Sequence, residues 1–182
     1  PPPHQSSAAS DVYKRQIYNL DNVLAAIAVG THFQVPPEDI KAAIEDYRPT
    51  NNRSQTLKLK SNTFILDAYN ANPSSMSAAL QNFEQIEAAK KVVILGDMLE
   101  MGEYSHAEHL AILKQVEKMN LQHIILVGKE FGKVASEIEN VLHFENAVLA
   151  KAWFEQQDFS DTHFLVKGSR GIALEKVLQK VE

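Results

Sequence analysis

Apolar residues in the first quarter of the chain recur with the spacing of helices. An i, i+3, i+4, i+7 pattern starts at Leu20 and predicts a helix that ends at Gly30. A second helix is predicted from Pro37, because proline suits a first turn and the two acidic residues after it favour the positive end of the helix dipole. Residues 48–52 (RPTNN) interrupt both periodicities and predict a linker, where we place a domain boundary.

Beyond residue 53 the pattern changes to short apolar runs separated by helical stretches. Residues 56–60 and 63–66 predict a hairpin around Ser61 and Asn62, while 92–95, 124–127 and 164–166 are typical of strands buried in a parallel sheet, and 142–144 is a weaker strand. Helical patterns lie between them at 74–87, 105–119, 131–138, 146–157 and 172–181. This order predicts an α/β domain with an open, mostly parallel, Rossmann-like sheet and helices on both faces.

Composition narrows the class of protein. The 182 residues are 45% hydrophobic and 23% charged with a net charge of -5, as in ordinary globular proteins, and no basic cluster suggests a nucleic-acid partner. The longest apolar run, 23–29, is far too short to span a membrane, and no secretory leader is evident, so we expect a cytoplasmic protein without membrane contact. The absence of cysteine excludes disulfides, thiolate metal sites and thiol nucleophiles.

The first sixteen residues lack any periodicity. Residues 1–16 contain a proline triplet and a Ser/Ala stretch and no initiating methionine, so we interpret them as a non-native or disordered leader. The segments that follow are then 17–50, with the two helices, and 51–182, with the α/β domain.

Loops that follow the predicted strands are the candidate sites, because open α/β sheets bind ligands beyond the carboxyl ends of their strands. In DAYNANPSS (67–75), Asp67 can accept hydrogen bonds from ribose hydroxyls or an amine, and Asn70 and Asn72 add amide groups ahead of a helix that Ser74 is expected to cap. A plain Asx-turn with a helix cap explains the same residues equally well.

The loop KGSRG (167–171) has a basic character. Lys167, Ser169 and Arg170 would converge on an anion at the start of a helix, where Arg170 could hold a carboxylate through two hydrogen bonds. Gly168 and Gly171 are small enough for a ligand to approach the backbone. The alternative is a basic loop in solvent.

An acidic segment follows the strand at 92–95. Asp97, Glu100 and Glu103 would repel phosphate unless a cation lay between them, and the alternative is a solvated loop that caps the next helix. His106 and His109 lack a third convergent ligand and are expected to be surface or capping residues. The loop GKEFG (128–132) resembles a phosphate loop only superficially, and because no G-x-x-x-x-G-K-[ST] occurs, a complete ATP site is not expected.

Taken together, these motifs resemble a known family. The segments are NLDNVLAAIAVG (19–30), Arg53 with Gln55, LDAYNANPSSM (66–76), VVILGDMLEMG (92–102), His109 and LVKGSRG (165–171). In this order they closely resemble the C-terminal part of the UDP-N-acetylmuramoyl-tripeptide:D-alanyl-D-alanine ligases (MurF), a branch of the Mur ligase family. The resemblance runs from about Tyr18 to the C-terminus, and YNANP-x-SM combined with GDM-x-E-x-G and KGSR is specific to that branch.

The resemblance implies a function for the longer parent protein. Such ligases use ATP and Mg2+ to phosphorylate the carboxylate of UDP-N-acetylmuramoyl-tripeptide, and the amine of D-alanyl-D-alanine attacks the acyl phosphate during bacterial peptidoglycan precursor synthesis in the cytoplasm. The family has three domains, so 17–50 would be the last helices of the central ATPase domain and 51–182 the whole C-terminal domain. We expect a monomer, and a fragment without activity, because the phosphate loop lies in the part that is absent here.

The resemblance also implies ATP-binding residues. Asn19 and Asn22 match an asparagine pair beside the adenine, Arg53 matches an arginine that reaches the phosphates, and Asp67 matches an aspartate near the ribose. Asn70 matches an asparagine of the closed interdomain cleft and is assigned to the ATP side. Tyr18 stands where many relatives have histidine, and Leu66 replaces an acidic residue of some members.

A second group is assigned to substrate binding. Asn72 matches the other asparagine of the cleft, and Lys167, Ser169 and Arg170 fit recognition of the incoming dipeptide. The family's phosphate-loop lysine, magnesium-binding acids and modified lysine belong to segments outside this chain, so no catalytic residue and no metal ligand is assigned.

Two other functions are compatible with the α/β pattern. One is a related amide ligase such as a folylpolyglutamate synthase, which would share the domain but not these motifs. The other is a non-catalytic module that binds a nucleotide or another anion. A phosphate loop upstream in the parent reading frame would separate a ligase from such a module.

Overall fold

The computed structural model describes residues 20–47 and 52–179. It divides into two compact units, Pro1–Arg48 and Pro49–Glu182, and each is described by itself. Asn19 and Tyr18 lie outside the described residues, as does the segment 1–16.

The N-terminal unit is a pair of helices, α2 (Leu20–His32) and α3 (Pro37–Asp46). The predicted start of α3 at Pro37 is confirmed, with acidic residues in its first turn. The predicted end at Gly30 is wrong, because α2 continues to His32. Gly30 instead lies against Ile40 of α3, since a Cβ on it would come within 2.8 Å of Ile40 Cδ1.

The C-terminal unit is built on a six-stranded sheet in the order β1-β2-β6-β3-β4-β5. β1 and β2 form the predicted hairpin, antiparallel, with its turn at Lys60 and Ser61, and every other neighbouring pair is parallel. The predicted fold class, α/β with an open and mostly parallel sheet, is therefore confirmed. The strands are β1 (Gln55–Leu59), β2 (Asn62–Asp67), β3 (Lys90–Gly96), β4 (His123–Val127), β5 (Val141–Phe144) and β6 (Thr162–Lys167).

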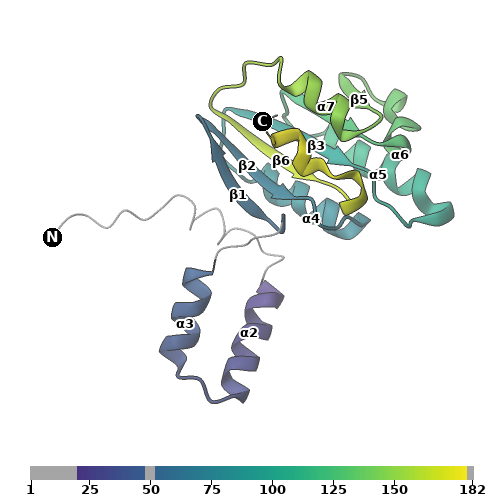
Figure 1. Ribbon diagram of the computed structural model, residues 1–182. Coiled ribbons are helices and arrows are strands. Elements are labelled where there is room, and N and C mark those ends of the chain that lie inside the picture. The colour runs from purple at the N-terminus through teal and green to yellow at the C-terminus, as the bar shows by residue number, and fades with distance from the viewer. Residues whose placement is uncertain (1–19, 48–51, 180–182) are drawn as a thin grey trace. The chain divides into compact units, whose positions relative to one another are not determined.

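The strand order places helices on both faces. The chain moves in one direction from β2 to β3, β4 and β5 and then returns to insert β6 between β2 and β3. Right-handed crossovers in opposite directions lie on opposite faces, so α4 (Pro73–Glu84) and α5 (Ser105–Glu117) cover one face and α7 (Ala147–Phe154) the other (Figure 1). The order reverses at β6, which makes the edge beyond β2 and β6 the expected place for a ligand.

Side chains along each strand point alternately to the two faces of the sheet, so the core is divided between these faces. Phe64 and Phe164, whose rings stack with centroids 4.4 Å apart, belong to a buried cluster that includes Ala147 and Ala150 of α7. The intervening residues of the same strands point to the face covered by α4 and α5, whose buried residues include Leu80 and Leu113.

Two predicted helices are wrong in type. The stretch 131–138 forms only a short α6 (Lys129–Gly132) and a 3-10 turn, η3 (Ala135–Glu137), and the C-terminal stretch forms the 3-10 segments η4 (Arg170–Ile172) and η5 (Leu174–Leu178). Over so short a run an i, i+3 spacing fits a 3-10 helix as well as an α-helix. Ala173, with φ of 55°, interrupts the C-terminal segment.

The remaining helical element is η2 (Gly102–Tyr104), which leads directly into α5. Among the described residues, no helix is long and apolar enough to cross a membrane.

Candidate functional site

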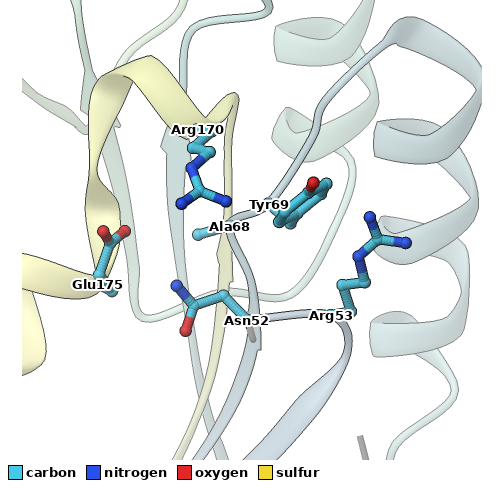
Figure 2. Close-up of a pocket in the computed structure, with 6 residues that line it drawn as sticks. All are labelled: Asn52, Arg53, Ala68, Tyr69, Arg170 and Glu175. Atoms are coloured by element: carbon cyan, nitrogen blue, oxygen red, sulfur yellow. The ribbon is translucent and has the colours of Figure 1, made fainter. Parts of the chain in front are cut away.

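A pocket of about 450 Å³ lies at the carboxyl ends of β2 and β6, the edge that the topology singles out. Three segments far apart in the chain line it (Figure 2): the start of β1, the loop after β2 and the turns after β6. Because β1 runs antiparallel to β2, its first residues meet the same edge. The lining residues are Asn52, Arg53, Ala68, Tyr69, Arg170 and Glu175.

Tyr69 lies between two arginines of this pocket (Figure 2). The Arg53 guanidinium carbon is 3.8 Å from the centre of the Tyr69 ring and that of Arg170 is 5.2 Å from it, so both cations face the aromatic ring. A hydrogen bond from Arg53, together with the charges of both arginines, lowers the pKa of the Tyr69 phenol. The sequence assigned Arg53 and Arg170 to separate ligands, whereas the structure places them against one ring.

Asp67 and Lys167 form an ion pair at the ends of the neighbouring strands β2 and β6. Lys167 Nζ lies 2.6 Å from Asp67 Oδ2 and also donates to the carbonyl of Asn70 at 3.2 Å. The side chain of Lys167 is only 2% exposed. The prediction that Lys167 and Arg170 converge as two cations on an anion is therefore wrong for Lys167, because its charge is used inside the protein.

The two asparagines of the first loop have different surroundings. Asn72 is the N-cap of α4, where its Oδ1 accepts from the backbone N–H of Ser75 at 2.8 Å. The Ser75 hydroxyl in turn accepts from the backbone N–H of Asn72, which completes a capping box. The predicted cap, Ser74, instead donates to Asn72 Oδ1. Asn70 is exposed and contributes its carbonyl to Lys167.

Ser169 is buried and connects its own loop to the loop that follows β3. Its hydroxyl accepts from the N–H of Leu99 at 3.0 Å and its own N–H donates to the carbonyl of Asp97 at 3.1 Å. The neighbouring Gly168 was expected to admit a ligand, but a Cβ there would lie 2.9 Å from the Cα of Gly96. The close approach at this glycine is therefore between two strand ends.

The three carboxylates of the acidic segment do not converge. Glu100 and Glu103 are exposed, whereas Asp97 is 3% exposed and accepts from the N–H groups of Glu130 and Phe131 at 2.9 and 2.8 Å. Asp97 thus caps the start of α6, the helix that the GKEFG segment forms after β4. Within residues 20–47 and 52–179, no group of three His, Asp or Glu side chains could hold a metal ion.

His109, which the sequence predicted to be a surface or capping residue, is buried. Its Nε2 accepts from the N–H of Met98 at 3.0 Å, its Nδ1 lies 2.7 Å from the carbonyl of Ser105, and its ring meets Phe131 edge to face. The apolar period of α5, which buries His109 with Ile112 and Leu113, is the signal that would have located it. His106, by contrast, is exposed as predicted.

Of the predicted site residues that the structure describes, only Arg53 and Arg170 line the pocket directly. Asp67, Lys167, Ser169 and Asn72 hold the loops around it through the bonds described above. Asn22 is exposed on α2 in the N-terminal unit, and Asn19 is not described. Tyr69 and Glu175 were missed, although Tyr69 stands inside the motif YNANP. Two guanidinium groups and a carboxylate give this pocket the chemistry to bind a small ligand that carries both charges.

Known proteins with similar sequences include UDP-N-acetylmuramoyl-tripeptide--D-alanyl-D-alanine ligases. The UDP-N-acetylmuramoyl-tripeptide--D-alanyl-D-alanine ligase of Bacillus subtilis (strain 168) is 33% identical over 171 residues, which are 89% of this chain and 37% of that protein. A crystal structure of MurF from Acinetobacter baumannii has a TM-score of 0.77 and 29% identity over 89% of this chain and 37% of its own. The chain thus spans little more than a third of the length of these relatives.

The folylpolyglutamate synthase of Thermotoga maritima offers a more distant comparison. Its structure has a TM-score of 0.53 and 13% identity over 79% of this chain and 34% of its own, which shows a shared fold alone.

The family model gives the broadest assignment. The model described as "Mur ligase, glutamate ligase domain" matches residues 52–170, a range that contains β1 to β6 and both arginines of the pocket. Since that range is more than half of the chain, this chain belongs to the Mur ligase family.

Proposed function

We propose that this chain is the C-terminal part of an ATP-dependent ligase that joins D-alanyl-D-alanine to UDP-N-acetylmuramoyl-tripeptide. The terminal carboxylate of the tripeptide would take the γ-phosphoryl group of ATP, and the dipeptide amine would then displace phosphate to form the amide, with ADP and phosphate released. The observation that carries this proposal is the 33% identity over 89% of the chain to a ligase of that name, with both pocket arginines inside the matched family domain.

In this proposal the pocket residues serve two ligands. Arg53 is exposed and has no carboxylate partner among the described residues, so its guanidinium is available to phosphate oxygens of ATP. Arg170, also exposed and on the other side of Tyr69, is available to the dipeptide carboxylate (Figure 2). Asp67, Lys167, Ser169 and Asn72 would act through the loops that they hold.

Three further asparagines are kept as proposed contacts to ATP. We keep Asn19 and Asn22 as proposed adenine contacts and Asn70 as a proposed contact to ATP. Residues 17–50 would be the last helices of the central ATPase domain and 51–182 the C-terminal domain. We keep Mg2+ as a proposed cofactor of the parent enzyme, bound mainly by its central domain.

ADP release in the full-length protein that contains this chain tests the function. We expect release that requires both UDP-N-acetylmuramoyl-tripeptide and D-alanyl-D-alanine, and none above a buffer blank from residues 1–182 alone. Release that depends on a folate and glutamate would establish the folylpolyglutamate synthase alternative. No release with any acceptor would favour a non-catalytic binding module.

Kinetics of two variants test the division of roles. Loss of a charge-assisted hydrogen bond costs about 1.5–3 kcal/mol, or roughly ten- to hundred-fold in the affected constant. Arg170→Ala should therefore raise the KM for D-alanyl-D-alanine with little change for ATP, whereas Arg53→Ala should weaken ATP use or lower turnover. An unchanged KM for the dipeptide in Arg170→Ala would eliminate the carboxylate role.

A further inference from the structure

Glu175 has an unusual position in the pocket described above. It lies in the first turn of η5, and its Oε2 atom is buried without a hydrogen-bond partner in the described part of the chain. A buried carboxylate oxygen that accepts no hydrogen bond is costly, so such an atom marks a place where a donor is expected. Oε2 is shielded in the unliganded chain, but Glu175 lines the pocket, and rotation about its last side-chain torsion would turn that oxygen toward a donor on a bound ligand.

Glu175 is also not neutralised by the nearby cations. Arg53, Arg170 and Glu175 line the same pocket, yet no ion pair within 4.0 Å joins Glu175 to either arginine in the described structure. Figure 2 shows Glu175 on the side of Arg170, well away from Arg53. Arg170 therefore offers hydrogen-bond donors to the pocket, and Glu175 offers an acceptor to the same pocket. The two side chains form no ion pair with each other.

The presence of both Arg170 and Glu175 in the pocket favours some ligand charges over others. A polyphosphate in that space would bring negative charge against Glu175, and a simple carboxylate would leave Oε2 without a donor. A plain amine would leave Arg170 without an anion. A free amino acid or a short peptide satisfies both, because it carries a carboxylate together with an N–H donor, and the volume of about 450 Å³ is within the range of roughly 300–1,000 Å³ for small-molecule sites.

We propose that Arg170 and Glu175 form a two-point recognition site for a free amino acid or short peptide, in which Arg170 binds the carboxylate and Glu175 Oε2 accepts an N–H of the same molecule. The inference rests on the proposed function, where the ligand is D-alanyl-D-alanine. Glu175 is then a specificity residue, because its hydrogen bond to an N–H of the dipeptide determines which amine substrate binds.

Binding to residues 1–182 tests the site directly, because all six lining residues lie in this chain. The assay is NMR titration of the 15N-labelled chain with D-alanyl-D-alanine, for the wild type and Glu175→Gln. The substitution keeps the side-chain shape and removes the charge, so the Kd should rise about ten- to hundred-fold, the range for a hydrogen bond to a charged group. The matched control is Glu139→Gln, at an exposed residue just before β5, the strand at the other end of the sheet from β1.

Ligand analogues identify the groups that are recognised. D-alanyl-D-alanine amide lacks the carboxylate and should bind weakly to both proteins. N-acetyl-D-alanyl-D-alanine lacks the ammonium, and D-alanyl-D-lactate lacks the peptide N–H. The analogue on which Glu175→Gln loses its effect identifies the N–H that Glu175 accepts, and either identification supports the site.

Several results would overturn the inference. These are a Kd in Glu175→Gln within twofold of the wild type, no shifts at the pocket up to the solubility limit of the dipeptide, or tighter binding of pyrophosphate than of D-alanyl-D-alanine by the wild type. The full-length enzyme separates this failure from failure of the proposed function. Turnover with D-alanyl-D-alanine and an unchanged dipeptide KM in Glu175→Gln would refute the site alone, and turnover only with another acceptor would refute the function alone.

Discussion

The ion pair between Asp67 and Lys167 leads to a prediction about stability. It joins residues 100 positions apart, at the ends of β2 and β6, with Nζ and Oδ2 2.6 Å apart. The two partners are not equally buried, since the Lys167 side chain is 2% exposed and that of Asp67 is 16% exposed. Asp67 also accepts from the N–H of Ser54 at 3.2 Å, whereas Lys167 has only the carbonyl of Asn70 besides Asp67.

This asymmetry predicts which substitution is worse. Asp67→Asn leaves a buried ammonium without a counter-ion, and removing one partner of a buried pair costs about 3–5 kcal/mol. Lys167→Met leaves a carboxylate that is nearer to solvent and keeps one backbone donor, so its cost should be smaller. The double variant should be more stable than Asp67→Asn, because no unpaired charge remains.

Urea unfolding monitored by fluorescence measures these differences. Trp153 is the sole tryptophan and lies in α7, so it reports on the C-terminal unit. The midpoint should fall for Asp67→Asn without a change in m, and the melting temperature should fall by roughly 10–20 °C if each kcal/mol is worth about 3–5 °C in a domain of this size. Equal costs for the two single variants, or additive costs in the double variant, would refute the argument from burial.

Three further predictions follow from other features. His109→Ala removes the acceptor for the N–H of Met98 and should cost about 2–5 kcal/mol in urea unfolding, whereas the exposed control His106→Ala should change stability by less than about 0.5 kcal/mol. The Tyr69 pKa is lowered chiefly by Arg53, so the phenol should titrate below its ordinary value in a 13C NMR titration and return toward that value in Arg53→Gln; an unchanged midpoint would contradict this cause. Because an acid with a lowered folded pKa stabilises the fold only as it ionises, the wild type should gain stability over Arg53→Gln as pH rises through the folded pKa of Tyr69, and that gain should be lost as pH falls below it. Residues 53–182, which contain all six strands, should unfold cooperatively without residues 1–52, and a molten product would show that the boundary is misplaced.

The sequence predicted the sheet well because its signals are local. Val92 to Leu95 form an uninterrupted apolar run, and such runs correspond to strands buried on both faces, as β3 is. Helices with a long apolar period, such as α5, were located for the same reason. The short segments failed, because eight residues from 131 to 138 do not distinguish an α-helix from 3-10 turns.

The site was predicted only in part, because its pairings depend on the tertiary fold. The sequence placed Lys167 beside Arg170 by proximity in the chain, but Lys167 is the last residue of β6, whereas Arg170 begins the 3-10 turn η4 after the strand. Lys167 therefore meets Asp67, its partner in the β2–β6 register, while Arg170 reaches Tyr69 beyond the strand. Neither contact can be derived from spacing, since each joins segments about 100 residues apart.

Because of the strand order, the pocket forms only when the last strand has joined the sheet. β6 is the last strand in sequence and inserts between β2 and β3, so Arg170 and Glu175 meet Tyr69 only after the C-terminal segment has paired with the earliest strands. The Asp67–Lys167 pair lies at this junction and fixes the end of β2 against the end of β6. A change that weakens this junction should therefore disturb the spacing of Arg53, Tyr69 and Arg170 even though it removes none of them. For this reason ligand affinity in Asp67→Asn is to be compared with that in the double variant, in which the unpaired charge is gone but both arginines are retained.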